Sequence, residues 1–149
     1  MARDDGICFL TAVELAAAIR ERELGAVEVV EAFLERIGRV NPALNAYVTL
    51  SAEGALEAAR RADAKTARGR RLAPLHGVPF SAKDLVFTAG VRTTAGSRIF
   101  ESFVPPNDAR VVARLVAAGA ILLGKTNTPE FGYKATTESP LFGPTLNPW

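Results

Sequence analysis

Apolar residues in the first 44 positions recur at the spacing of an α-helix, with polar residues between them. Thr11 and Glu14 lie three positions apart at the head of such a stretch, which is the pattern of a capping box. We therefore expect a helix from Thr11 to about Gly25. A second helix should follow and end at Asn41-Pro42, because proline rarely continues a helix. Its apolar stripe consists of Val27, Val30, Phe33, Leu34, Ile37 and Val40.

From residue 45 onward the pattern changes between the two-residue period of strands and the helical period. The expected elements are a strand at 46–50, a helix at 51–66, a strand at 78–84, a helix from Asn107 or Asp108 to Gly119, a strand at 120–123 and a short helix near Pro129. Glycine and proline make most of 88–106 a loop. Strands that alternate with helices predict an α/β fold in which at least part of the sheet is parallel.

Only about three strands can be counted, which is few for a stable layered α/β domain. We therefore expect the sheet to be incomplete in this chain, with apolar edge and face left exposed. Exposed edges and apolar faces pair with other chains, so self-association, for example as a homo-oligomer, is the expected behaviour in solution. Trp149 is expected to be a packing residue.

The net charge is +2, but one stretch is strongly basic. Residues 60–71 contain six Lys or Arg and one acid, which gives this stretch +5 and leaves −3 for the remainder. Such a run can contact nucleic acid or an acidic lipid surface. No aromatic residue lies within it to stack on bases, so a solvated helix end is favoured and nucleic-acid binding is disfavoured.

The sequence also carries indications of compartment. A single cysteine, Cys8, allows no internal disulfide and favours a reducing environment. Met1–Asp5 carries two acids and lacks the apolar stretch of a signal peptide, and no run approaches the ~18 apolar residues of a membrane span. The expected location is the cytoplasm, and no association with a membrane is expected. One histidine and one cysteine offer no obvious cluster of metal ligands.

Residues 119–126 match the phosphate-loop pattern G-x-x-x-x-G-K-[ST] letter for letter. A phosphate loop needs a strand before it and a helix after it, so that backbone N–H groups point at the phosphates. Here the preceding segment has a helical period, and the four inner residues, Ala-Ile-Leu-Leu, favour a buried strand. We therefore expect a helix, a tight turn at Gly119, a core strand and a turn at Gly124. A nucleotide-binding protein is the disfavoured alternative.

Lys83 is the residue of greatest chemical interest. On an extended 78–84 segment, Ser81 and Lys83 lie on one face and Ala82 on the other. A lysine near the end of an apolar strand is unusual. If it is buried, desolvation favours its neutral form, which can accept a proton from a hydroxyl nucleophile. The alternative is a surface lysine paired with Asp84, and the spacing does not choose between the two.

Several segments together resemble one known family. Residues 75–84, LHGVPFSAKD, are similar to the G-[IV]-P-x-x-x-K-D segment of the amidase-signature family. The similarity continues in the same order through 93–97 (TTAGS), the helix start at Asp108, 119–131 (GAILLGKTNTPEF), 139–143 (SPLFG) and 147–149 (NPW). Several motifs in the right order, over nearly the whole chain, make the match specific.

The resemblance implies a fold and an activity. Residues 1–149 would be the N-terminal part of a single amidase-signature domain, with N-terminal helices at 1–44 and the start of the α/β core, a mixed sheet flanked by helices, at 45–149. The family hydrolyses non-peptide carbon–nitrogen bonds of small-molecule amides through a Ser–cis-Ser–Lys triad, without a metal or organic cofactor. Lys83 matches the family lysine, which deprotonates the bridging serine.

The same resemblance implies that both triad serines and the glycine-rich oxyanion loop follow the Asn-Pro-Trp segment. They are absent from these residues, and Ser81, Ser97 and Ser139 match positions that are not catalytic. This chain alone is therefore expected to be inactive. The alternative is a non-catalytic remnant or interaction module of amidase ancestry. Which amide is cleaved, and whether a glutamine-amidotransferase partner takes part, stay open.

Other positions carry weaker expectations. Gly132, Tyr133 and Lys134 match a loop that borders the acyl pocket in relatives, so they are candidate substrate contacts. Asp84 is expected to organise the backbone around the lysine or to cap the strand end. His76, the only histidine, is expected to be structural or on the surface.

Overall fold

The chain crosses repeatedly between two units in the computed structural model, which describes residues 6–149. The first unit contains the residues up to Ile37, Ala52–Phe80 and Arg114–Leu123. The second contains Gly38–Ser51, Ser81–Ala113 and Gly124–Trp149. Met1–Asp5, the segment expected to lack a signal peptide, lies outside the described residues.

The first helix, α1 (Ala12–Glu21), begins with the predicted capping box. The N–H of Glu14 donates to Thr11 Oγ1 at 3.2 Å, and the N–H of Thr11 donates to Glu14 Oε2 at 2.7 Å. These bonds satisfy donors that a helix N-terminus otherwise leaves without partners. The helix ends at Arg22, which has a left-handed φ of 64°, a few residues before the predicted end at Gly25.

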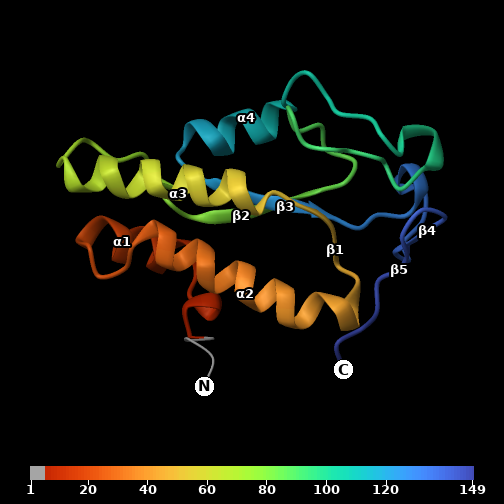
Figure 1. The fold of residues 1–149 in the computed structure, drawn as a ribbon, viewed down its shortest axis with the longest axis horizontal. Helices are drawn as coiled ribbons and strands as arrows, with labels where there is room; N and C mark the ends of the chain where they lie inside the picture. The colour runs from red at the N-terminus through yellow and green to blue at the C-terminus, as the bar shows by residue number, and fades with distance from the viewer. Residues whose placement is uncertain (1–5) are drawn as a thin grey trace. The chain divides into compact units, whose positions relative to one another are not determined.

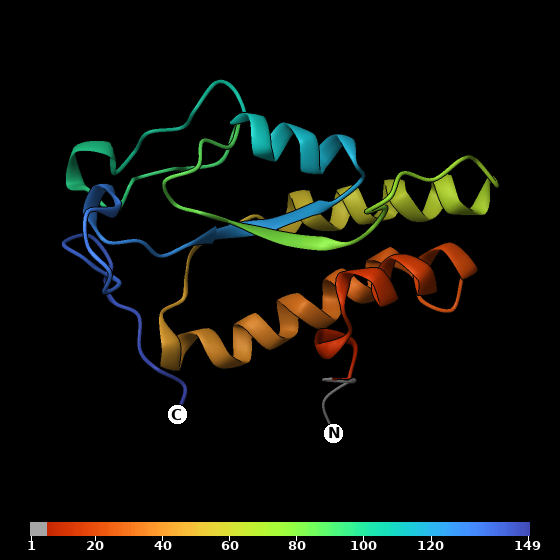
Figure 2. The same cartoon turned by 180° about the vertical axis from the view of Figure 1, so that it is seen from behind.

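The second helix, α2 (Ala26–Leu44), receives its N-terminal cap from α3 (Ala52–Ala67). The Asp63 carboxylate of α3 accepts from the N–H of Ala26 at 2.7 Å and from the N–H of Val27 at 3.1 Å. A carboxylate also suits the positive end of the helix dipole. In both views α1, the start of α2 and α3 lie side by side (Figures 1 and 2). Their buried residues are Leu15, Ala16, Ile19, Ala26, Val29, Val30, Ala55, Ala59 and Ala62.

α2 continues past Asn41-Pro42, where the sequence predicted its end. Pro42 stands in the last turn, so it removes one backbone hydrogen bond without interrupting a long run of them. The Asn41 side chain closes the helix instead, because its Oδ1 accepts from the N–H of Ala46 at 2.9 Å and from that of Tyr47 at 2.7 Å. This cap leads the chain into β1 (Tyr47–Leu50).

The main sheet contains β1, β2 (Pro79–Lys83) and β3 (Ile121–Thr126). Their order across the sheet is β1-β3-β2. β1 pairs antiparallel with β3. β2 and β3 run parallel, since Ile121 N–H donates to Val78 O at their starts and Asp84 N–H donates to Thr126 O at their ends. The sheet is therefore mixed, and the predicted parallel pair is present (Figures 1 and 2).

β3 is longer than predicted, because the chain does not turn at Gly124. Gly124 lies opposite Leu50 of β1, and a Cβ atom added there would lie 2.2 Å from Thr49 O. The absence of a side chain permits this close approach of two strands. The helix and the tight turn predicted before the strand are present, with a φ of 92° at Gly119.

The last helix, α4 (Arg110–Ala117), begins later than the predicted cap at Asn107 or Asp108. The Asp108 carboxylate accepts instead from the N–H of Ala89 at 2.7 Å and so holds the 88–106 loop.

The expectation that Trp149 is a packing residue is wrong, because its side chain is fully exposed. The remaining elements are 3-10 turns at Ile7–Phe9, Arg98–Phe100 and Glu130–Gly132, the last of them predicted near Pro129, and an unpredicted ribbon of β4 (Glu138–Ser139) and β5 (Gly143–Pro144).

Gly124→Ala should destabilise the fold by roughly 1–3 kcal/mol, because a methyl group would push Thr49 O away and loosen the pairing of β1 with β3. Gly38→Ala is the matched control, since a Cβ there meets nothing within 4 Å on α2. It should stabilise the fold by about 0.5–1 kcal/mol. Urea denaturation of the three chains measures both effects. Equal effects of the two substitutions would contradict the close approach at Gly124.

Candidate functional site

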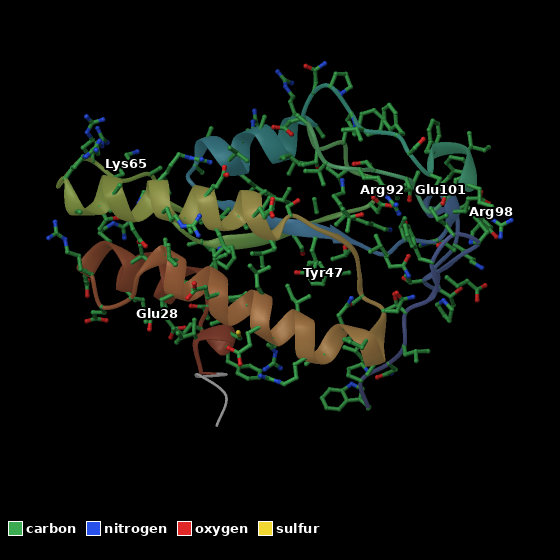
Figure 3. All side chains as sticks on the ribbon, in the orientation of Figure 1. Glu28, Tyr47, Lys65, Arg92, Arg98 and Glu101 are labelled. Carbon is green, nitrogen blue, oxygen red and sulfur yellow. The ribbon has the colours of Figure 1, made fainter. Side chains whose placement is uncertain are left out.

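Lys83 is the last residue of β2, and the alternation predicted for this strand is present. Ser81 and Lys83 are exposed, whereas Ala82 between them is buried. The nearby Ser81 side chain acts on the phenol of Tyr47, which Figure 3 labels. Burial raises the pKa of Tyr47, and the interaction with Ser81 partly offsets this rise. The face that carries Lys83 therefore also carries Ser81.

The structure places Lys83 in neither of the environments that the sequence left open. Its side chain is not buried. The Asp84 carboxylate, which was the alternative partner, is fully buried and accepts hydrogen bonds from Thr94. Because successive side chains of a strand point to opposite sides, Lys83 and Asp84 cannot easily face each other.

Asp84 fixes the backbone directly after Lys83. Its two carboxylate oxygens accept from the N–H of Thr94 at 3.2 and 3.1 Å, and one of them also accepts from the Thr94 hydroxyl. Its own N–H donates to Thr126 O at 2.9 Å, and its carbonyl accepts from the N–H of Ala95 at 2.9 Å. Side chain and backbone of Asp84 are thus both held, which is the organising arrangement expected for this residue.

A second lysine, Lys125 on β3, is fully buried in the unit that contains Lys83. Its ammonium group donates to Thr88 Oγ1 at 3.0 Å, to Thr93 Oγ1 at 2.9 Å and to the carbonyl of Val86. All three acceptors lie in the segment that follows Lys83. A buried ammonium needs such partners, because it has given up its hydration.

Burial lowers the pKa of Lys125 from 10.5 to about 8, although the nearby charges of Asp84 and Asp108 favour the protonated form. Desolvation is the larger of these effects. Lys125 is therefore mostly charged at neutral pH and loses its proton in mildly alkaline solution.

Sequence reasoning missed Lys125, because it ended the strand at Gly124. Ile121 and Leu123 are buried, and Lys125 continues their alternation on the same face. Extending the predicted strand by two residues would have placed a lysine in the core. The alternation of Ile121, Leu123 and Lys125 is therefore the sequence signal from which the buried position of Lys125 could have been predicted.

The candidate substrate-contacting loop lies against the segment after Lys83. A Cβ atom added at Gly132 would lie 2.6 Å from Leu85 Cδ1, so the loop backbone packs directly on a side chain two residues beyond Lys83. Tyr133 is exposed, and Lys134 forms an ion pair with Glu138 that raises the pKa of Lys134. The structure therefore brings Gly132 near the Lys83 segment and leaves the Tyr133 ring open to solvent.

The remaining candidates have structural partners. His76 is buried, and its Nε2 lies 3.1 Å from both Thr66 Oγ1 and Ala62 O, so the expectation of a structural histidine is confirmed. Ser97 Oγ accepts from the N–H of Ile99 at 3.3 Å, and Ser139 Oγ accepts from the N–H of Phe142 at 3.0 Å. These serines hold turns.

The basic stretch 60–71 covers the end of α3, where Figure 3 labels Lys65, and the loop that follows. Within residues 6–149, no group of three or more His, Cys, Asp or Glu residues could hold a metal ion. None of the helices in this range is long and apolar enough to span a membrane. The phosphate-loop pattern falls on a turn and on β3, with Gly124 and Lys125 inside the strand, so the loop that a nucleotide would need is not formed.

Comparison with known proteins shows the family to which the chain belongs. The family described as Amidase matches residues 28–149. The chain belongs to the amidase family. A glutamyl-tRNA(Gln) amidotransferase subunit of Acidothermus cellulolyticus is 52% identical over 139 residues, which cover 93% of this chain and 28% of that protein. The resemblance predicted from the sequence is confirmed, and so is the mixed α/β fold.

Solved amidase-family structures agree with this fold. A bacterial aryl acylamidase of the amidase-signature family has a TM-score of 0.90 and 29% identity, over 94% of this chain and 29% of its own. A vestigial protein complex, described as revealing the evolutionary origins of an s-triazine catabolic enzyme, has a TM-score of 0.89 and 41% identity, over 93% and 31%. The chain thus spans less than a third of the length of these relatives.

The stability contributed by Lys125 should depend on pH. Between pH about 8 and 10.5 the folded protein has released the Lys125 proton while the unfolded chain still holds it, so stability rises with pH in this window. The free energy of unfolding of the wild type, relative to Lys125→Met, should therefore rise by about 3 kcal/mol across the window. Urea denaturation at several pH values measures it. Lys65→Met, on α3, is the control for losing a positive charge, and a flat difference for Lys125→Met would contradict the buried charge.

Proposed function

We propose that this chain carries the proton-accepting lysine of an amidase, and that Lys83 is this residue. The observation that carries the proposal is the placing of Lys83: it ends β2 on the exposed face, and the next residue, Asp84, is held by its side chain and by its backbone. An amine that starts from a fixed backbone is suited to a proton transfer, which needs heavy atoms within about 2.6–3.2 Å. Membership of the amidase family supports the same role.

In the proposed reaction, a neutral Lys83 takes a proton from a bridging serine, which takes one from the nucleophilic serine. The nucleophile attacks the amide carbonyl, and backbone N–H groups stabilise the resulting oxyanion. The relay returns a proton to the leaving nitrogen, an amine or ammonia departs, and water hydrolyses the acyl-enzyme. This route uses no metal or organic cofactor. The two serines do not lie within residues 1–149, so these residues alone are proposed to be inactive.

The proposal also sets a requirement on the environment of Lys83. A lysine accepts a proton only in its neutral form, which desolvation favours. Lys83 is exposed here, so other parts of the enzyme must cover it in the active state. Gly132, Tyr133 and Lys134 are proposed substrate contacts, and the packing of Gly132 on Leu85 supports a place for this loop beside the lysine segment.

The substrate is proposed to be a small carboxamide such as glutamine. Curated relatives at about 50% identity are subunits of amidotransferases, and such an enzyme needs an amide that releases ammonia. The same relatives support a partner protein, which would receive the ammonia. The solved aryl acylamidase, at lower identity, makes an aryl amide the second substrate to test.

Ammonia release from glutamine and amine release from an aryl amide should separate these proposals. The product of the whole reading frame should be active, and residues 1–149 alone should stay at background. Lys83→Ala should lower kcat roughly 10²–10⁴-fold, because it removes the proton acceptor. Lys65→Ala, on α3, is the matched control and should leave kcat unchanged. A Lys83→Ala enzyme with more than half of the wild-type kcat would refute the role of Lys83.

Self-association of the 149-residue chain is a separate expectation. The sheet order leaves β1 and β2 as edges. In the second unit, Phe87, Phe103, Phe100 and Phe131 form an aromatic row at centroid distances of 5.5, 5.7 and 6.1 Å, and all but Phe103 are exposed. Light scattering should show an apparent mass that rises with concentration. Ile99→Lys, beside this row, should reduce the rise, whereas Val13→Lys on α1, where the side chain is equally exposed, should not. A monomer at all concentrations would contradict the expectation.

A further inference from the structure

One side chain of β3, that of Lys125, makes three hydrogen bonds to the segment after Lys83. The ammonium group of Lys125 donates to the carbonyl of Val86 and to the hydroxyl oxygens of Thr88 and Thr93. We call these four residues the Lys125 clamp. The clamp joins three points of the 84–94 loop to one buried nitrogen atom.

One of the clamp bonds leads straight back to Lys83. The N–H of Val86 donates to the carbonyl of Lys83 at 2.8 Å, and the carbonyl of Val86 accepts from Lys125. Val86 is therefore bonded at its N–H to the backbone of Lys83 and at its carbonyl to Lys125. Lys125 and the end of β2 are therefore connected through a single residue.

A second connection reaches the same place from the other side. Lys125 bonds the Thr93 hydroxyl, and the adjacent Thr94 donates its N–H and its hydroxyl to the carboxylate of Asp84. Two neighbouring threonines thus join a buried cation to a buried anion. The carbonyl of Asp84 accepts from Ala95, so this connection also ends on the backbone next to Lys83.

An apolar side chain would fill the position of Lys125 at a lower cost in folding free energy. Ile121 and Leu123 fill the same face of β3, and burying a charge costs free energy even when it is paired. A charged group there has a use that leucine or methionine lacks, because it offers three donors to three acceptors of one loop. The group is mostly charged at neutral pH, with the carboxylates of Asp84 and Asp108 as the charges that favour its protonated form.

We propose that Lys125 is a positioning residue for Lys83: by holding the 84–94 loop, it fixes the end of β2 from which the Lys83 side chain starts. The inference rests on the proposed role of Lys83 as the proton acceptor. Lys125 does not touch the substrate in this proposal and acts only through the backbone.

The test uses substitutions that weaken the clamp without removing the buried charge. Thr88→Val and Thr93→Val are close in shape to threonine, and each removes one acceptor of Lys125. Thr66→Val is the matched control, because Thr66 is a buried threonine whose hydroxyl bonds Ala62 O and His76 in the first unit. Lys125→Met removes the whole clamp.

Two quantities would be measured on the active enzyme, the product of the whole reading frame. The first is kcat against KM for amide hydrolysis: Thr88→Val and Thr93→Val should lower kcat about tenfold and Lys125→Met about 100-fold, with KM nearly unchanged, because a misplaced reacting group slows chemistry rather than binding. The second is hydrogen exchange at the amides of Val86 and Ala95, which should speed up about tenfold or more in these variants and stay unchanged in Thr66→Val.

The outcomes separate the two proposals. If exchange at Val86 and Ala95 accelerates while kcat stays at the wild-type value, or if Thr66→Val lowers kcat as much as Thr93→Val, Lys125 does not position the catalytic lysine. If Lys83→Ala is fully active, the proposed function fails, and unchanged exchange in Thr93→Val would show separately that the clamp does not fix the end of β2. If Lys125→Met does not fold, the two threonine variants decide the matter.

Discussion

β3 is hydrogen-bonded to a neighbouring strand along each of its edges, and the positions of these neighbours explain why glycine and lysine stand at 124 and 125. On one side it pairs antiparallel with β1, which approaches so closely that Gly124 has no room for a side chain. On the other side it runs parallel to β2, the strand that ends in Lys83. Between these neighbours the strand turns one face into the core, and Lys125 lies on that face. Two consecutive residues therefore have different roles. Gly124 allows the backbone of β1 to approach, and Lys125 holds the loop that follows β2.

Features set by nearby residues could be predicted from the sequence. The capping box of Thr11 and Glu14 spans three positions, so its geometry follows from local spacing alone. The exposed and buried alternation of Ser81, Ala82 and Lys83 follows from the pleat of a strand. The family motifs around Lys83 gave the fold class, because several segments matched in order and the family comparison bears this out.

Features set by contacts across the chain could not be predicted in the same way. The cap of α2 comes from Asp63, more than thirty residues away, and Asp108 bonds Ala89 instead of capping α4. The continuation of β3 past Gly124 depends on how near β1 lies, which the pattern of β3 does not contain. The environment of Lys125 could not be predicted either, because Lys125 lies in this continuation of β3 and its three acceptors come from the distant segment 86–93. The family motifs thus identified the catalytic candidate, and tertiary contacts decided what supports it.

The parallel pairing of β2 with β3 has a consequence for how the protein is made. Residues 84–120 separate the two strands, so β2 has no partner when it leaves the ribosome and stays unpaired until β3 has been synthesised. Contacts between segments so far apart in sequence form slowly, whereas the hydrogen bonds within each helix join residues only four positions apart. We therefore expect the end of β2 that bears Lys83 to be among the later parts of this chain to form. Until then, its unpaired strand edge is what a chaperone or a neighbouring nascent chain would meet.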